Sequence, residues 1–241
     1  MILLSERLKT VAEMVNFDSV SDIGTDHGKL PVYLVQSGKV KFAIASDINE
    51  GPVEACRRTV EKFNLSDKIN IRRSDGLENF APFETKTLCI AGMGGELIFQ
   101  ILKSFPEKTN SFEEIVLQPM TQTERLKKCL FDNGFVILDE TLAKEKNKIY
   151  DVIKVKKTNN KVEYKYVDLF FSDKLLQKKD DIFTEYKNKI IKKILAAVEG
   201  IKKSSAADEN EIEFLMNVLK EVESVDETEK DNRCFGKHSI T

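Results

Sequence analysis

The sequence predicts an α/β protein with a seven-stranded, mostly parallel, Rossmann-like sheet, followed by a helical hairpin. Short apolar segments alternate with helix-like segments up to about residue 157 of the 241, which is typical of parallel sheets with helical crossovers. Acidic residues and glycines follow the first strands, where such sheets bind their ligands. Beyond residue 161 apolar residues recur every three or four positions, as in long helices.

The predicted strands are short and continuously apolar, as expected when helices cover both faces of a sheet. They lie at 19–24, 41–48, 68–75, 87–95, 113–119, 135–143 and 150–157. Helices are predicted at 3–15, 30–38, 51–64, 95–105 and 121–134. Because no helix separates the last two strands, we expect them to form an antiparallel edge.

The C-terminal part is predicted to form two helices, at 170–203 and 211–225, that fold into an antiparallel, coiled-coil-like hairpin. We therefore divide the chain into an α/β domain at 1–160, a hairpin at 161–230 and a tail at 231–241. Seventeen lysines and nine acidic residues lie between 144 and 203, whereas two lysines and ten acidic residues lie between 208 and 231. The basic segment indicates a surface for nucleic-acid phosphate, although two solvated helix faces would give the same counts.

Composition indicates a cytoplasmic protein. The four cysteines are scattered without a CxxC pair, which favours reduced thiols over a disulfide or metal framework. No apolar run approaches the roughly 20 residues that span a bilayer, and the N-terminus lacks the features of a signal peptide. The net charge of -2 says nothing about partners, and the oligomeric state stays open between a monomer and a weak dimer.

The end of the first strand, DIGTDHG, carries the most informative residues. Its glycines, Gly24 and Gly28, are spaced G-x-x-x-G and not G-x-G-x-x-G, which disfavours a nicotinamide dinucleotide. A pyrophosphate would be repelled by Asp26, whereas an ammonium or sulfonium group would be attracted by Asp22 and Asp26. His27 follows directly, at a position where it can face a reacting group.

The next strand ends supply the remaining parts of an adenosine pocket. Asp47 ends the second strand, before Ile48 and Asn49, where an acid binds a ribose diol. Asp75 and Gly76 end the third strand, where they can contact an adenine ring. The fourth strand runs into a loop that exposes its backbone, formed by Ala91, Gly92, Met93, Gly94 and Gly95. Each motif alone is common in turns and helix caps, but the series predicts S-adenosylmethionine as the ligand.

The fourth loop also bears on the target atom. Methyltransferases that act on an exocyclic amine often carry an Asn/Asp-Pro-Pro-aromatic turn here, and AGMGG contains neither proline nor an aromatic residue. A ring nitrogen with its own lone pair suits this loop, because no strong base must first remove a proton. We assign Asp26 and His27 to placing the base and stabilising the cationic product.

These motifs resemble a known family. LSERL, DIGTDHGKLP, DINEGPVEA, RRSDGLE, IAGMGGELI, VLQPM and IYDVI are similar to the bacterial tRNA adenine-N1-methyltransferases that modify adenine 22. The resemblance covers residues 4–157, and the helical tail by architecture only. It implies a class I methyltransferase domain, S-adenosylmethionine as donor, and a hairpin that helps to hold tRNA. By similarity, the cofactor and reaction site is lined by Asp22, Gly24, Asp26, His27, Asp47, Asn49, Asp75, Gly76 and residues 91–95.

Two features bear on the RNA substrate. Lys29 stands where family members can carry an aromatic residue, so we assign it no role in stacking the target adenine. Gln118 and Pro119, which end the fifth strand, are candidates for the base slot, although Pro119 can equally serve only to start the next helix. Lys187, Lys192 and Lys193 are among the basic residues expected to contact tRNA phosphates.

Other functions remain compatible with parts of the sequence. A class I methyltransferase can act on another RNA, a protein or a small molecule, and the basic segment argues only weakly against the last. A non-catalytic RNA-binding protein with a vestigial cofactor pocket is disfavoured by the intact series of acidic strand ends. No metal site is predicted.

Overall fold

The computed structural model describes residues 1–178, 181–204 and 208–225, so the expected tail at 231–241 lies outside the described residues. The chain divides into two compact units, Met1–Lys178 and Lys179–Thr241. Among the described residues, no helix combines the length and apolar character that crossing a bilayer requires.

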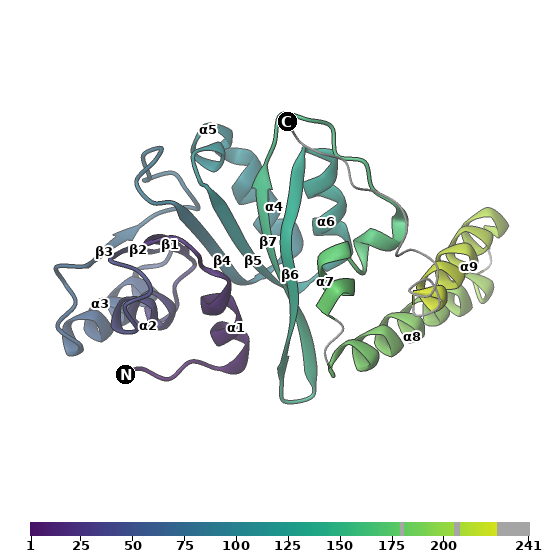
Figure 1. The fold of residues 1–241 in the computed structure, drawn as a ribbon, viewed down its shortest axis with the longest axis horizontal. Coiled ribbons are helices and arrows are strands. Elements are labelled where there is room, and N and C mark those ends of the chain that lie inside the picture. Colours follow the sequence, from purple (N-terminus) through teal and green to yellow (C-terminus); the bar gives the residue numbers. More distant parts are fainter. Residues whose placement is uncertain (179–180, 205–207, 226–241) are drawn as a thin grey trace. The chain divides into compact units, whose positions relative to one another are not determined.

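The first unit contains the predicted seven-stranded sheet, in the order β3-β2-β1-β4-β5-β7-β6 (Figure 1). The strands are β1 (Ser19–Ile23), β2 (Phe42–Asp47), β3 (Ile69–Arg73), β4 (Thr87–Gly94), β5 (Glu114–Thr121), β6 (Phe135–Glu145) and β7 (Lys148–Lys157). Strands β1 to β5 pair in parallel, whereas β7 is antiparallel to both β5 and β6. The predicted antiparallel hairpin at one edge is confirmed.

Helices cover both faces of this sheet (Figure 1). They are α1 (Glu6–Met14), α2 (Lys29–Gln36), α3 (Glu50–Lys62), α4 (Gly95–Ser104), α5 (Pro106–Asn110) and α6 (Thr123–Asp132). Buried residues of α1, α2 and α3 share one apolar cluster, and those of α4 and α6 share a second. The unit is therefore a three-layer α/β domain, and the predicted fold class is confirmed.

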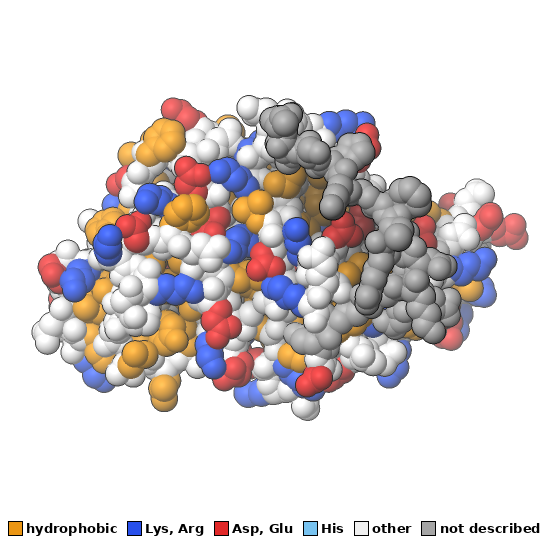
Figure 2. All heavy atoms as spheres, viewed as in Figure 1, with side chains coloured by type: hydrophobic (Ala, Val, Ile, Leu, Met, Phe, Trp, Pro, Cys, Tyr) orange, Lys and Arg blue, Asp and Glu red, His pale blue; other side chains and the backbone are white. Residues whose placement is uncertain are grey.

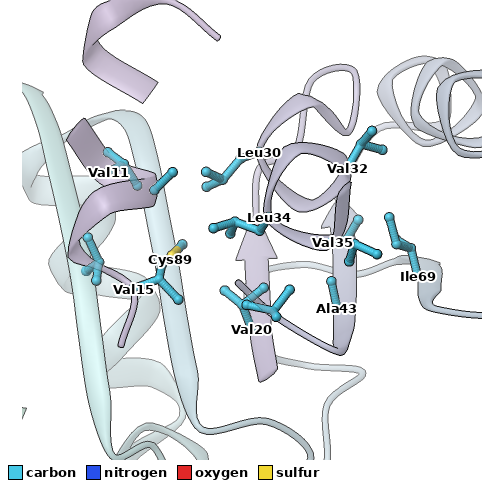
Figure 3. Close-up of a cluster of buried hydrophobic side chains, with 14 of the residues drawn as sticks. Val11, Val15, Val20, Leu30, Val32, Leu34, Val35, Ala43, Ile69 and Cys89 are labelled. Atoms are coloured by element: carbon cyan, nitrogen blue, oxygen red, sulfur yellow. The ribbon is translucent and has the colours of Figure 1, made fainter. Parts of the chain in front are cut away.

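The two clusters follow from the alternation of side chains along each strand. In β4, Cys89 faces the α1 and α2 side, whereas its neighbours Leu88 and Ile90 face the α4 and α6 side. Figure 3 shows the first cluster, in which Leu30 and Leu34 of α2 lie beside side chains of α1 and of the central strands. Because the central strands are buried on both faces, their ends are the only parts open to a ligand.

The parallel register brings the carboxyl ends of the central strands together. Ile23 at the end of β1 pairs with Ser46 of β2 and with Ile90 of β4. The backbone N–H groups of Gly24 and Thr25 then donate to the carbonyl of Ser46, at 2.8 and 2.9 Å. The loop after β1 is thus fixed against β2, at the edge where the predicted site lies.

Residues 161–178, which we grouped with the hairpin from the sequence, belong to the first compact unit. They contain a 3-10 turn, η1 (Tyr166–Leu169), and a short helix, α7 (Asp173–Lys178). The Lys127 Nζ lies 2.5 Å from Glu140 Oε1, with both side chains fully buried. This pair anchors the connecting segment, because Lys127 donates to the carbonyl of Phe170 and Glu140 accepts from the N–H of Ser172.

The second unit is a helical hairpin of α8 (Phe183–Lys202) and α9 (Glu209–Ser224). The Lys187 Nζ near the start of α8 donates to the carbonyl of Glu223 near the end of α9, at 3.0 Å, so the helices are antiparallel as predicted. The single helix expected at 170–203 is instead α7 and α8. The apolar stripe continues through both, but Leu175 of α7 is buried in the first unit and Ile190 of α8 in the second.

Candidate active site

A cavity of about 410 Å³ opens at the carboxyl ends of β1 and β4, which is in the size range of small-molecule sites. Its walls come from α1, the loop after β1, the start of α2, the end of β4 and the end of β6. The lining residues are Leu3, Ser5, Arg7, Leu8, Asp22, Gly24, Thr25, Asp26, His27, Lys29, Leu30, Ala91, Gly92 and Glu145. Six predicted site residues are thus brought together: Asp22, Gly24, Asp26, His27, Ala91 and Gly92.

The loop after β1 begins with a turn whose backbone conformation favours glycine. Gly24 has a φ of +77°, in the left-handed region that other residues rarely adopt. A Cβ at this position would also overlap the terminal methyl of Met93. The DIGTDHG motif therefore brings the loop after β1 against the loop after β4, and the cavity lies beside this contact.

Asp22 is the buried acid of the site. Its side chain lies in the cavity wall, yet the residue is only 6% exposed. Burial is the main reason that the pKa of this carboxyl is raised from 3.8 to about 6; an interaction with the Thr25 side chain opposes the rise, and the charge of Asp47 adds to it. A desolvated carboxylate of this kind favours a positively charged ligand.

Asp26 and His27 form the exposed side of the same loop. The Nε2 of His27 lies 3.4 Å from Oδ2 of Asp26, and their side chains are 50% and 81% exposed. Both line the cavity. They can meet a group that enters from solvent, whereas Asp22 can meet only a group that is already inside.

Asp47, Ile48 and Asn49 lie at the end of β2, outside the lining of the cavity. The Asp47 Oδ1 accepts from the N–H of Asn49 at 2.8 Å, which shapes the turn into α3. The side chain of Ile48 is half exposed. This turn is nevertheless the next strand end along the edge, since β2 pairs with β1.

Asp75 and Gly76 follow β3, which pairs with β2, one strand further along the edge. Asp75 is exposed and its carbonyl accepts from the N–H of Glu78, which makes a turn. Gly76 is buried, and a Cβ there would lie 3.1 Å from Ile101 of α4. The acidic ends of β1, β2 and β3 therefore follow one another along a single edge, as the sequence predicted.

The AGMGG loop ends β4 and begins α4. The register between β4 and β5 shifts after Ala91 and again after Met93, so Gly92 lies in a β-bulge with a φ of +83°. Gly95 has no room for a side chain, because a Cβ there would lie only 2.7 Å from the carbonyl oxygen of Gln122. Gly94 lies between these positions, at the end of the strand. The bulge turns the exposed Gly92 toward the cavity.

The structure places Gln118 and Pro119 differently from our expectation of a base slot. Both are buried and neither lines the cavity. The Gln118 Oε1 accepts from the N–H of Gly92 at 3.1 Å and from Nη1 of Arg7 at 2.5 Å, while its Nε2 donates to the carbonyl of Pro119. Its side-chain amide is therefore engaged inside the protein.

Sequence reasoning missed Arg7 and Glu145 as lining residues. Arg7 belongs to the LSERL motif, at helical spacing between Leu4 and Val11, which pack into the core cluster. A charged residue within a core-facing stripe was the available signal. Glu145 ends β6 and gave no comparable signal. Among the described residues, no cluster of three or more His, Cys, Asp or Glu side chains is arranged to hold a metal ion.

Comparison with known proteins identifies the family. The family model for tRNA (adenine(22)-N(1))-methyltransferase matches residues 20–224. This chain belongs to the tRNA (adenine(22)-N(1))-methyltransferase family. A curated Bacillus subtilis protein of that name is 32% identical over 229 residues, which cover 91% of this chain and 96% of the relative.

Solved structures agree with this family assignment. The B. subtilis m1A22 tRNA methyltransferase superposes with a TM-score of 0.80 at 30% identity, over 92% of this chain and 99% of that one. A Streptococcus pneumoniae protein solved in complex with S-adenosyl-L-methionine gives a TM-score of 0.79, with the same identity and coverage. The likeness spans nearly the full length of each protein, so it includes both the sheet domain and the hairpin segment.

Within this family member, the predicted phosphate-contacting lysines fall into two groups. Lys187 is 8% exposed and its amine donates to the carbonyl of Glu223, so it holds the two helices of the hairpin together. Lys192 and Lys193 are exposed on α8. On the face drawn in Figure 2, basic and acidic side chains of the described residues are interspersed over the sheet domain. Lys192 and Lys193 are therefore the better candidates for a phosphate contact.

The buried carboxyl predicts a measurable effect on stability. Above pH 6 the folded protein carries a desolvated charge at Asp22, which the unfolded chain solvates. The free energy of unfolding should therefore fall as pH rises from about 4 to 6 and stay low above that. At about 1.4 kcal/mol for each unit of pKa, the Asp22→Asn variant should gain up to about 3 kcal/mol at pH 7.5, measured by urea unfolding without ligand.

The gain should shrink toward zero as pH is lowered to about 4. Asp26→Asn is the matched control, because Asp26 lies in the same loop with an exposed side chain. A gain for Asp22→Asn that does not change with pH would show that the carboxyl is not destabilised by its burial.

Proposed function

We propose that this chain transfers a methyl group from S-adenosylmethionine to N1 of adenine 22 in tRNA. The observation that supports this most strongly is the run of acidic strand ends on β1, β2 and β3 beside the cavity, in a chain of this family. The tRNA-modifying activity named for the B. subtilis relative is consistent with the site. Such a protein would act in the cytoplasm, where its substrate is found.

The residues present fit the donor. Asp22 lines the cavity as a desolvated carboxyl, which suits the ammonium end of the donor. Asp47, with Ile48 and Asn49, would meet the ribose, and Asp75 with Gly76 would meet the adenine ring. When bound, S-adenosylmethionine supplies an electrophilic methyl group. If Asp22 binds the ammonium, the Asp22→Asn variant should lose affinity for S-adenosylhomocysteine in calorimetry.

The loop after β4 would receive the target adenine. Ala91 and Gly92 line the cavity without a bulky side chain, and the bulge exposes backbone to a flat ring. N1 carries its own lone pair, so the protein need only align N1 with the methyl carbon and the sulfur. Methylation leaves the ring positively charged, and Asp26, beside His27, would stabilise that charge. In this proposal Met93 and Gly94 shape the loop.

The hairpin would hold the tRNA body. We assign the hairpin of α8 and α9 to this role, with the basic α8 as its core. Phosphate contacts carry no sequence information, so selection of the site would come from the shape of the RNA. A base held in the folded tRNA must leave its stack to reach a buried methyl group.

The function is tested by radiolabelled methyl transfer to unmodified tRNA, followed by mapping of the modified base. We expect one methyl group per tRNA, located on N1 of adenine 22. The matched control is the same tRNA with guanine at position 22, which should accept none. Transfer to a protein or a small molecule but not to tRNA, or transfer that survives the replacement, would contradict the proposal.

The role of Asp26 predicts a loss of turnover. Replacing its carboxylate by an amide removes the charge that would face the cationic product. The Asp26→Asn variant should lower kcat at saturating substrates by about tenfold, a modest factor because the side chain is largely exposed. S-adenosylhomocysteine affinity should stay within about threefold of the parent. An unchanged kcat would show that the Asp26 carboxylate does not stabilise the cationic product.

The hairpin assignment predicts an effect on tRNA binding that depends on salt. Reversing two exposed charges, in the Lys192→Glu/Lys193→Glu variant, should raise the KM for tRNA by about tenfold near 0.1 M salt and less at higher salt. The kcat should change little. Lys62→Glu/Lys68→Glu, which reverses two exposed lysines beside β3, changes the net charge by the same amount; it is the matched control and should leave this KM unchanged. An equal rise of the KM for tRNA in both variants would contradict the assignment, because it would show that only the net charge of the protein matters.

A further inference from the structure

The bulge in β4 leaves one backbone group that the sheet does not satisfy. Between Ala91 and Met93 the pairing with β5 is interrupted, so the Gly92 N–H loses its ladder partner. A buried or half-buried N–H without a partner is costly. Here Gln118 takes over, since its Oε1 accepts from this N–H at 3.1 Å. The position of the Gly92 peptide therefore depends on the position of one side-chain oxygen.

That oxygen is itself held by Arg7. The Arg7 Nη1 donates to the same Oε1 at 2.5 Å, while Gln118 Nε2 donates to the carbonyl of Pro119 at 2.7 Å. The second bond fixes which end of the amide faces Arg7 and Gly92. A Cβ at Gly92 would lie 3.6 Å from Arg7 Nη1. The guanidinium thus lies directly against the bulge that it supports.

Glu145, the last residue of the edge strand β6, completes this network. Its Oε2 is buried and accepts no hydrogen bond from the residues that the structure describes, and it lies 3.7 Å from Nε of Arg7. A buried carboxylate oxygen of this kind needs a compensating charge, which Arg7 provides. The guanidinium can face Glu145 through Nε and Gln118 through Nη1 at once, whereas a lysine has only one nitrogen for both.

We propose that Arg7 is a positioning residue for methyl transfer: acting through Gln118, it fixes the bulged Gly92 peptide on which the acceptor base is placed. Arg7 comes from α1, Gln118 from β5 and Glu145 from β6. The N-terminal helix is thereby coupled to the reaction site. The inference rests on the proposed methyl transfer, and it adds to that proposal the residues that hold the loop after β4 in its shape.

The first test is a comparison of kinetic constants. The Arg7→Lys variant keeps a positive charge beside Glu145, so it should fold, but it cannot hold both partners. We expect kcat on tRNA to fall at least tenfold, with KM for the donor and for tRNA within about threefold of the parent. Arg57→Lys is the matched control, because Arg57 is half exposed on α3 and pairs with Glu54; its constants should not change.

The second test asks whether Arg7 acts through Gln118. Gln118→Met keeps the length of the side chain and removes the acceptor, and it should lower kcat similarly. The Arg7→Lys/Gln118→Met double variant should then lose no more kcat than Gln118→Met alone. Losses that multiply would overturn the proposal. So would a raised KM for the donor with kcat unchanged, which would assign Arg7 to direct contact with the donor.

A third measurement needs no catalytic activity. Hydrogen exchange of the peptide covering 88–95 should be faster in Arg7→Lys and in Gln118→Met than in the parent and in Arg57→Lys. Faster exchange would support the coupling of Arg7 to the Gly92 loop even if the parent protein methylates another substrate. A failure of the proposed function can therefore be distinguished from a failure of this inference. Unchanged exchange in both variants would overturn the inference.

Discussion

The site depends on a carboxyl group that the fold removes from water. Asp22 is the penultimate residue of the central strand β1, which is paired on both sides, and its neighbours in the chain, Ser21 and Ile23, are both buried. The sheet therefore cannot offer this carboxylate solvent, and the pKa rises to about 6. A cationic ligand at the cavity would recover part of this cost on binding. The same desolvation that lowers the stability of the free protein thus favours the donor over neutral or anionic molecules.

The sequence was most informative where the signal is local. Strand and helix positions follow from apolar runs, and the meeting of Asp22, Asp47 and Asp75 along one edge follows from the rule that parallel strands end on the same side. It was least informative about which neighbour a buried residue contacts. The apolar stripe of 170–203 is divided between α7 and α8, which belong to two different units. Such a stripe predicts which residues are buried, but it does not predict which element they pack against.

The same limit explains the polar residues. Lys187 and Lys192 look alike in the sequence, yet the first holds the carbonyl of Glu223 and the second is exposed. Gln118 looked like a contact for the base because it ends a strand at the right edge, but its amide is engaged with Gly92 and Arg7. In each case a tertiary hydrogen bond decides the role, and such bonds leave no periodic pattern.

The AGMGG loop shows how motifs far apart in the sequence depend on one another. The glycine at 92 permits the bulge, and the bulge frees an N–H group. That N–H donates to the side-chain oxygen of Gln118, which is held in turn by Arg7 of LSERL. Gly24 of DIGTDHG has a left-handed φ of +77°, which favours glycine, and its backbone lies against the side chain of Met93. Four short motifs, including VLQPM with Gln118, therefore define one surface. The arginine in LSERL interrupts an apolar stripe because its guanidinium binds the Gln118 side chain, which belongs to another element. A charged residue inside a core-facing stripe is therefore a useful sequence signal of a functional site.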